Sequence, residues 1–229
     1  MGCGALGLAL LAGYWVFQPD PVDELSSSDR DARRGAVAAM SASADKPSGV
    51  RRIAEAVKHE NPTVACRALR ALAAGSGANK PLSEEGRKVA EAAARDSRPV
   101  VCVAAVQVLE ATTPPLPEDT AVPETVLKVL VEADEPSVRA AAARALGKFQ
   151  YWRAMEPLLD AMADDSAEVR GAAGRAVRQI LGLDYGFRAE ASLPDRQAAL
   201  ARLRSGWRSS KRYHEEHARR VREARKAGS

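Results

Sequence analysis

The sequence predicts an all-α fold, a solenoid of about five stacked helix pairs closed by a C-terminal capping helix. The main observation is a nine-residue block that recurs five times: a valine or alanine, often an arginine, then an alanine-rich stretch ending in a large apolar residue. The blocks begin 31 to 37 residues apart, at Ala32, Val64, Val101, Val138 and Val169. Periods of this length indicate a stacked repeat protein rather than one globular core.

The block that begins at Val138 shows why each copy is expected to be helical. Its apolar residues have the i, i+4, i+7, i+8 spacing of one helix face: Val138, Ala142, Ala145 and Leu146. The alanines allow a neighbouring helix to approach closely. Pro136 precedes the block, where its missing N–H is harmless, and Gly147 is expected to cap the end of the helix.

A second set of helices is predicted between the blocks, over residues 50–58, 84–95, 123–133 and 152–163. Short valine-rich runs could form strands, but helical spacing on both sides argues against it. Each pair leaves an apolar face that it cannot bury alone, so stacked neighbours are expected to bury a continuous core. The repeats are predicted to span residues 31–183.

The last two repeats resemble the HEAT-repeat family, in particular the short HEAT-like repeats of the phycobilisome-lyase type. The matching residues are Asp134, Pro136, Val138 and Arg139 in one repeat, and Asp164 or Asp165, Val169 and Arg170 in the next. The first three repeats match less well, because Ala65 and Cys102 replace the expected arginine. The resemblance implies a ladder of loop aspartates and helix arginines, so Arg139 and Arg170 are interpreted as structural.

The first 19 residues carry no charged side chain, which predicts a hydrophobic anchor of a single-pass membrane protein. A spanning helix needs roughly 17–25 apolar residues, so the stretch is at the lower limit. A cleaved signal peptide and a helix packed on the first repeat remain alternatives. Arginines that follow the segment favour a cytoplasmic location for the rest of the chain: Arg30, Arg33 and Arg34. Residues 20–30 are expected to form a linker.

The C-terminal end is predicted to contain a cap over residues 184–208 and a basic helical tail over residues 209–229. Leu200, Leu203 and Trp207 fall on one helical face and are expected to cover the open end of the core. Basic residues of the last helix fall near one face and are candidates for an anionic surface: Arg208, Arg212, Arg219, Arg222 and Lys226. A solvated helix is the simpler interpretation of this tail.

The sequence predicts no catalytic residue, no cofactor and no metal site. His214 and His217 are three residues apart, whereas the helical zinc-protease motif needs four, and no third ligand is evident. Cys66 and Cys102 lie in alanine-rich blocks with no zinc-binding spacing, so they are interpreted as small buried residues. No phosphate-binding loop and no nucleophile elbow are found.

The predicted function is a non-enzymatic, membrane-tethered scaffold or adaptor that binds another protein on the concave face of the solenoid. In the HEAT-like family the second helix of each pair lines that face. The predicted contact residues are therefore Arg70, Gln107, Arg144 and Arg175. Arg144 and Arg175 match across repeats, so membership of the structural ladder is the alternative for them. Two other functions remain open: binding of nucleic acid or an anionic lipid surface by the tail, with nucleic acid the less favoured partner, and a lyase-like enzyme.

Overall fold

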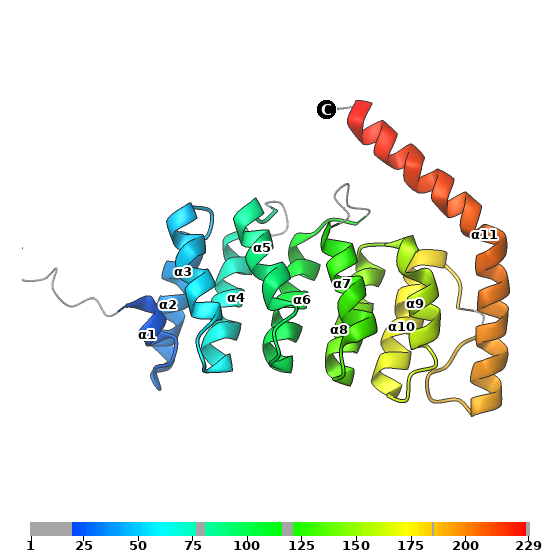
Figure 1. The fold of residues 1–229 in the computed structure, drawn as a ribbon, viewed down its shortest axis with the longest axis horizontal. Coiled ribbons are helices and arrows are strands. Elements are labelled where there is room, and N and C mark those ends of the chain that lie inside the picture. The colour runs from blue at the N-terminus through cyan, green and yellow to red at the C-terminus, as the bar shows by residue number, and fades with distance from the viewer. Residues whose placement is uncertain (1–19, 77–80, 116–120, 185, 228–229) are drawn as a thin grey trace, which may run out of the picture.

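The computed structural model describes residues 20–76, 81–115, 121–184 and 186–227, and every regular element in these ranges is a helix (Figure 1). The predicted all-α fold is therefore confirmed. In chain order the helices are α1 (Pro21–Glu24), α2 (Arg30–Ser41), α3 (Pro47–Val57), α4 (Pro62–Ser76), α5 (Glu84–Ala93), α6 (Pro99–Thr112), α7 (Ala121–Glu132), α8 (Pro136–Lys148), the short 3₁₀ helix η1 (Trp152–Ala154), α9 (Met155–Ala161), α10 (Ala167–Leu181) and α11 (Leu193–Ala227).

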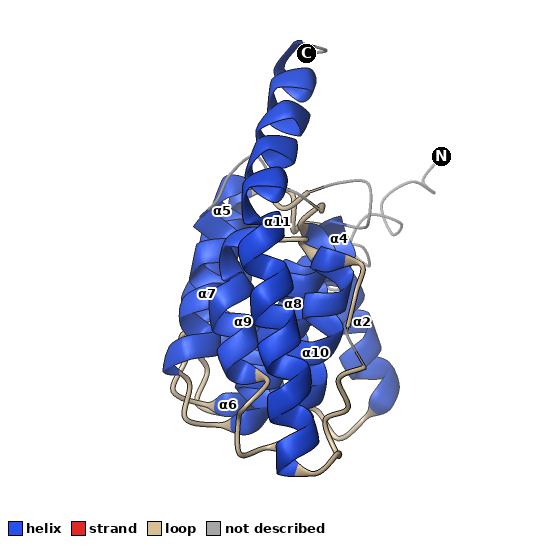
Figure 2. Cartoon of the chain, turned by 90° about the vertical axis from the view of Figure 1, so that its right-hand side faces the viewer, coloured by secondary structure: helices blue, strands red, loops and turns tan. Residues whose placement is uncertain are grey.

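The helices stack as pairs in two layers, α1 with α2, α3 with α4, α5 with α6, α7 with α8, and α9 with α10. The second helices of the pairs, α2, α4, α6, α8 and α10, pack side by side in one layer, and α3, α5, α7 and α9 form the other (Figure 2). Each recurrent block of the sequence is one helix of the second layer. The repeat period therefore corresponds to one helix pair, and the stack runs from α1 to α11 (Figure 1).

Small residues bring the second-layer helices close together, most of all α8 and α10. The alanines of α8 at 140–143 and 145 are almost fully buried, and Leu146 is fully buried beside them. The sequence predicted that Gly147 caps this helix, and this prediction is wrong. The helix α8 continues to Lys148, and its C-cap is Phe149. A Cβ on Gly147 would lie 2.7 Å from Cα of Ala176, so glycine is needed here for the close approach of α10.

Arginines in the first turn of α8 and α10 bind the loops that precede these helices, and Arg139 also joins consecutive repeats. The Nε and Nη2 atoms of Arg139 donate to the Asp164 carboxylate at 2.8 and 3.0 Å, and its Nη1 donates to the carbonyl oxygens of Ala133 and Asp134 at 3.0 and 2.6 Å. Arg170 repeats the second pattern, with Nη1 bonded to the carbonyl oxygens of Asp164 and Asp165 at 2.9 and 2.8 Å. These contacts give both arginines the structural role that the resemblance implied. We call the ion pair between the arginine of one repeat and the aspartate of the next a rung of the ladder. The carboxylate of this rung is that of Asp164, whereas Asp134 contributes its carbonyl oxygen.

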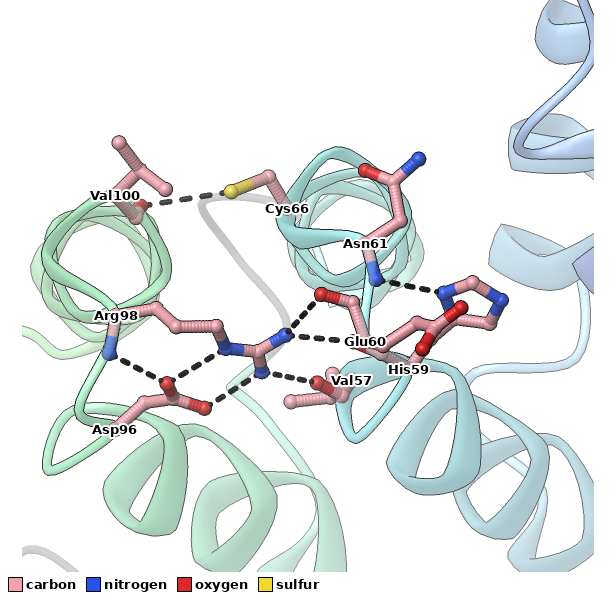
Figure 3. A network of polar contacts seen from close by, with 8 residues as sticks. All are labelled: Val57, His59, Glu60, Asn61, Cys66, Asp96, Arg98 and Val100. Atoms are coloured by element: carbon pink, nitrogen blue, oxygen red, sulfur yellow. Dashed lines mark hydrogen bonds and ion pairs between the residues drawn. The ribbon is translucent and has the colours of Figure 1, made fainter.

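Arg98 performs the same task in the third repeat, although it lies four residues before the position expected from the pattern (Figure 3). Its Nε and Nη2 bind the Asp96 carboxylate at 2.8 and 2.7 Å. Its Nη1 and Nη2 also donate to the carbonyl oxygens of His59 and Val57, at 2.6 and 3.0 Å, where α3 ends within the preceding repeat. The second repeat has Ala65 where the pattern expects an arginine. Arg98 therefore joins the third repeat to the second in place of that missing arginine.

Residues 193–227 of the predicted cap and tail lie in one continuous helix, α11, of 35 residues, and residues 186–192 of the predicted cap are not helical. In its first half Leu203 and Trp207 are buried, and the Trp207 Nε1 atom donates to Glu156 at 2.9 Å. Arg204 forms an ion pair with Asp160 at 2.7 Å, so the cap is fixed to α9 by polar as well as apolar contacts. The second half of α11 extends beyond the stack (Figures 1 and 2).

The prediction of a membrane-anchored, single-pass protein is corrected. Among the described residues, no helix combines the length and the apolar character needed to cross a membrane. The longest, α11, is rich in charged residues, so length alone does not make it a span. The stretch on which the anchor was placed, residues 1–19, lies outside the described residues.

Candidate protein-binding surface

The four predicted contact residues occupy one equivalent position in four consecutive repeats. Each lies six residues after the first valine of its block, on α4, α6, α8 and α10 respectively: Arg70, Gln107, Arg144 and Arg175. Because these helices pack side by side, the four positions form a row across the second layer. We call the exposed surface of α2, α4, α6, α8 and α10 the second-helix face.

Three of these four side chains are free to contact a partner. Arg70, Gln107 and Arg175 are exposed, and none has a hydrogen bond or ion pair within the described residues. Arg144 is 37% exposed and lies 3.8 Å from Glu168, which is a long and solvent-screened pair. The row is therefore distinct from the ladder, whose arginines at 98, 139 and 170 are held by carboxylate and carbonyl oxygens.

A groove between α4 and α6 accompanies this row and has a volume of about 500 Å³. Its apolar lining is Cys66, Ala73, Val100, Val103, Ala104 and Val108, and its polar lining is Arg70, Gln107 and Ser137. Val100 is 58% exposed, which is high for a large apolar residue of a packed helix. Two of the predicted contact residues thus flank an apolar groove, which we call the α4–α6 groove.

The sequence analysis did not predict the valines of this groove as contact residues, although the composition of α6 is unusual. Residues 99–109 contain one polar side chain, Gln107, so the helix is apolar on nearly every side. A helix of this kind is expected to be buried all round. The structure instead covers only part of α6, because α4 and α8 flank it in the layer and α5 backs it, and the remaining side faces outward.

Charge is divided between the two layers of helices. The helices α2, α4, α6, α8 and α10 carry eleven Lys or Arg and three Asp or Glu, whereas α3, α5, α7 and α9 carry five and eight. Four of these arginines are already bonded, Arg139 and Arg170 in the ladder, and Arg33 and Arg67 to the carbonyl oxygens of Ser27 and Leu25. The remaining charges still leave the second-helix face positive, so it should attract an acidic partner more than a basic one.

Neither described cysteine has the character of a nucleophile. Burial raises the pKa of Cys102 to about 11, and the Sγ atom lies 2.7 Å from the carbonyl oxygen of Ala94. Burial also raises the pKa of Cys66, against the smaller opposing effects of Arg70 and Arg98. A reactive cysteine needs a lowered pKa. Cys102 is a small buried residue, as interpreted from the sequence, whereas Cys66 is only partly buried and lines the α4–α6 groove.

The predicted anionic-surface residues all lie on α11. Arg208, Arg212 and Arg219 are exposed, and the latter two reach Glu216 and Glu223 at 3.1 and 3.9 Å on the same helix. Arg222 and Lys226 belong to the helix, but their side chains lie outside the described set. Burial, and to a smaller extent His217, lowers the pKa of His214, which favours its neutral form. Exposed intrahelical pairs of this kind contribute little and leave the arginines accessible.

The described residues contain no group of three histidine, cysteine or acidic side chains that could hold a metal ion. Two further grooves, of about 440 and 610 Å³, lie on either side of the α7–α8 loop and share Glu132, Ala133 and Asp134. Both are open and of mixed polarity. Their charged residues include the loop acids and the ladder pair Arg139–Asp164, which is committed to structure.

Comparison with known proteins agrees with the repeat pattern. Residues 123–219 match the family model of HEAT repeats, which covers α7 to α10 and most of α11. No curated protein matches the chain in sequence.

Three solved structures are similar to this chain, each with a TM-score below 0.5. The archaeal HEAT-like repeats protein from Thermococcus onnurineus NA1 is 14% identical, with 89% of this chain and 84% of that chain covered and a TM-score of 0.47. An engineered protein from the Northeast Structural Genomics Consortium is 19% identical, with 91% and 96% covered and a TM-score of 0.45. A designed armadillo repeat protein is 16% identical, with 90% and 99% covered and a TM-score of 0.43. Similarity at this level transfers no ligand or activity.

The family match falls on the two repeats in which the Asp, Val and Arg pattern is most regular, and the structure shows the arginine contacts that this pattern implied. The match over residues 123–219 supports the HEAT-repeat family, and the helix pairs stacked from α1 to α10 agree with it.

Proposed function

We propose that this protein is a non-enzymatic scaffold that holds a protein partner on its second-helix face. The observation that carries the proposal is the α4–α6 groove, in which exposed Val100 lies beside the free side chains of Arg70 and Gln107. A protein interface typically has an apolar centre, where burial supplies the affinity, and a polar rim that gives specificity. The groove and the row of polar residues supply these two parts on one surface.

A photocrosslinking amino acid at Gln107 tests this proposal in cells that naturally contain the protein. A control probe replaces Lys88, which is exposed on α5 in the other layer. We expect a discrete protein adduct from position 107 and none from position 88. Equal labelling from both positions, or no adduct from either, would contradict the proposal.

Two matched valine variants show whether the adduct depends on the groove. Val100→Asp places a charge in the α4–α6 groove, and Val131→Asp places the same charge on α7, where the valine is 64% exposed. Both positions are exposed, so both variants should fold. The position 107 adduct should be lost with Val100→Asp and retained with Val131→Asp. Retention in both variants would show that the groove is not the contact site.

A further inference from the structure

The row of equivalent positions sets a spacing that a partner must match. Packed helices lie roughly 8–10 Å apart between axes, so side chains at one register position of α4, α6, α8 and α10 recur at about that interval. An extended chain in the polyproline II conformation rises about 3.1 Å per residue with three residues per turn, so every third side chain lies on the same side and about one helix of the layer further along. An extended segment along the stack can therefore present one side chain to each position of the row.

The chemistry of the row selects the side chains that would face it. Arg70, Arg144 and Arg175 place guanidinium groups at three of the four positions, and Gln107 places a neutral amide at the other. Guanidinium groups bind carboxylates through two parallel hydrogen bonds, which are stronger than bonds between neutral groups. The long Arg144–Glu168 pair costs little to exchange for a carboxylate of the partner.

The α4–α6 groove adds an apolar requirement at one end of the row. Because Val100, Val103 and Ala104 line it, the partner has to place apolar side chains between the residues that face Arg70 and Gln107. Nucleic acid lacks such groups, and its single strands are usually bound on exposed aromatic side chains. The large apolar residue exposed on α6 is a valine, and the exposed aromatic residue Tyr213 lies on α11.

We infer that the partner presents an extended acidic segment in the polyproline II conformation that runs along the second-helix face, with a carboxylate about every third residue and apolar side chains in the α4–α6 groove. The inference rests on the proposed function and names the chemical class of its partner. Affinity then comes from the groove, and direction and register come from the row of arginines.

Two fluorescent peptides of identical composition test the inference with the full chain at about 0.15 M salt. The spaced peptide contains four copies of Asp-Leu-Ser, which places a carboxylate at every third residue. The clustered peptide contains the same residues with the four aspartates adjacent. Fluorescence polarisation should show tighter binding of the spaced peptide, by about tenfold, because only its carboxylates can reach successive helices.

Charge-reversal variants locate the binding. Arg70→Glu and Arg175→Glu should each weaken binding of the spaced peptide by about tenfold. Arg52→Glu is the matched control, because Arg52 is exposed on α3 in the other layer, and it should change binding by less than about twofold. All three substitutions are at exposed positions, and thermal unfolding checks that each variant is folded.

Equal binding of the two peptides, equal effects of Arg52→Glu and Arg70→Glu, or no binding of the spaced peptide would overturn the inference. An oligonucleotide that displaces the peptide and loses affinity with the same arginine variants would assign the row to nucleic acid instead. The proposed function and the inference about the acidic partner can be told apart by the crosslinking experiment. If the position 107 adduct requires Val100 but is unchanged in Arg70→Glu and Arg175→Glu, the scaffold stands and the acidic partner does not.

Discussion

The junction between the fourth and fifth repeats and the junction before it are closed in different ways. In the later junction Arg139, which follows the first valine of its block, binds the carboxylate of Asp164, five residues before the next block. The two equivalent positions of the earlier junction are Cys102 and Ala133. Both charges of the rung are therefore replaced by small uncharged side chains, and a groove of about 440 Å³ lies where the ion pair would be.

The difference shows that a ladder is assembled one rung at a time. Because each repeat contacts only its neighbours, the loss of one rung weakens one junction and leaves the others unchanged. The apolar contacts of α6 with α8 hold the earlier junction in the second layer. We expect this junction to be the place where the stack opens most easily, and five predictions test the comparison.

The largest effect is expected from Leu146→Ala. Leu146 is fully buried in α8, the helix that takes part in both junctions. Deletion of its side chain should lower the free energy of unfolding by about 2–5 kcal/mol, since the close-packed alanines around it leave little room to collapse. Urea denaturation measures the loss. A change within the scatter of surface substitutions would mean that α8 is not central to the stack.

The next effect concerns the intact rung. Arg139→Ala should cost about 1–3 kcal/mol, because it leaves the Asp164 carboxylate and two carbonyl oxygens without their donor. The Arg139 and Asp164 side chains are 20% and 13% exposed, so water can replace the arginine only in part. Arg144→Ala is the control, with a loss below about 0.5 kcal/mol for its long, exposed pair. Equal losses in the two variants would refute a special role for the rung.

Acid should first weaken the junctions that contain an arginine–aspartate ion pair. Burial alone would raise the pKa of Asp164, but hydrogen bonds from Arg139 and the Ser166 N–H lower it overall. The hydrogen bonds from Arg98 likewise lower the pKa of Asp96. An aspartate whose pKa is lowered in the folded state stabilises the protein at pH values above its unfolded-state pKa, which is near 3.9. This stabilisation is lost as the pH falls through the folded-state pKa. Stability measured from about pH 5 to 2 should fall less steeply in Asp164→Asn than in the unmodified protein.

A rung can also be added. Cys102→Arg combined with Ala133→Asp places the missing pair in the groove, and should stabilise the protein by about 1 kcal/mol. Each single substitution should give no gain, because it adds an unpaired charge. A double-mutant cycle isolates the coupling, and native-state hydrogen exchange should show slower exchange around the α7–α8 loop. Additive effects of the two substitutions would mean that these positions do not face each other as Arg139 and Asp164 do.

The sequence was sufficient for the repeat architecture, because each block carries its own apolar period and the blocks recur. It also assigned Arg139 and Arg170 to structure. It did not identify Arg98, which lies outside the repeat pattern, although the Asp-x-Arg spacing of residues 96–98 was a signal. Gly147 was misread because close helix packing and helix capping both favour glycine. The opposite charge of the two layers becomes visible only when each helix has been assigned to its layer.

The smallest effect on stability is expected at the C-terminus. Truncation after Trp207 removes the part of α11 beyond the cap, and should change the free energy of unfolding by less than about 0.5 kcal/mol. Trp207 keeps its contact with Glu156, although it loses the ring of His214 at 5.7 Å. Any binding to DNA or anionic vesicles should disappear with the truncation, and in the full chain it should be weak near 0.15 M salt, where charges are screened beyond about 8 Å. Tight binding at that salt concentration that disappears with the truncation would give the tail a function of its own and would move the principal surface away from the second-helix face. Binding that survives the truncation would instead belong to the stacked helices and would contradict the prediction.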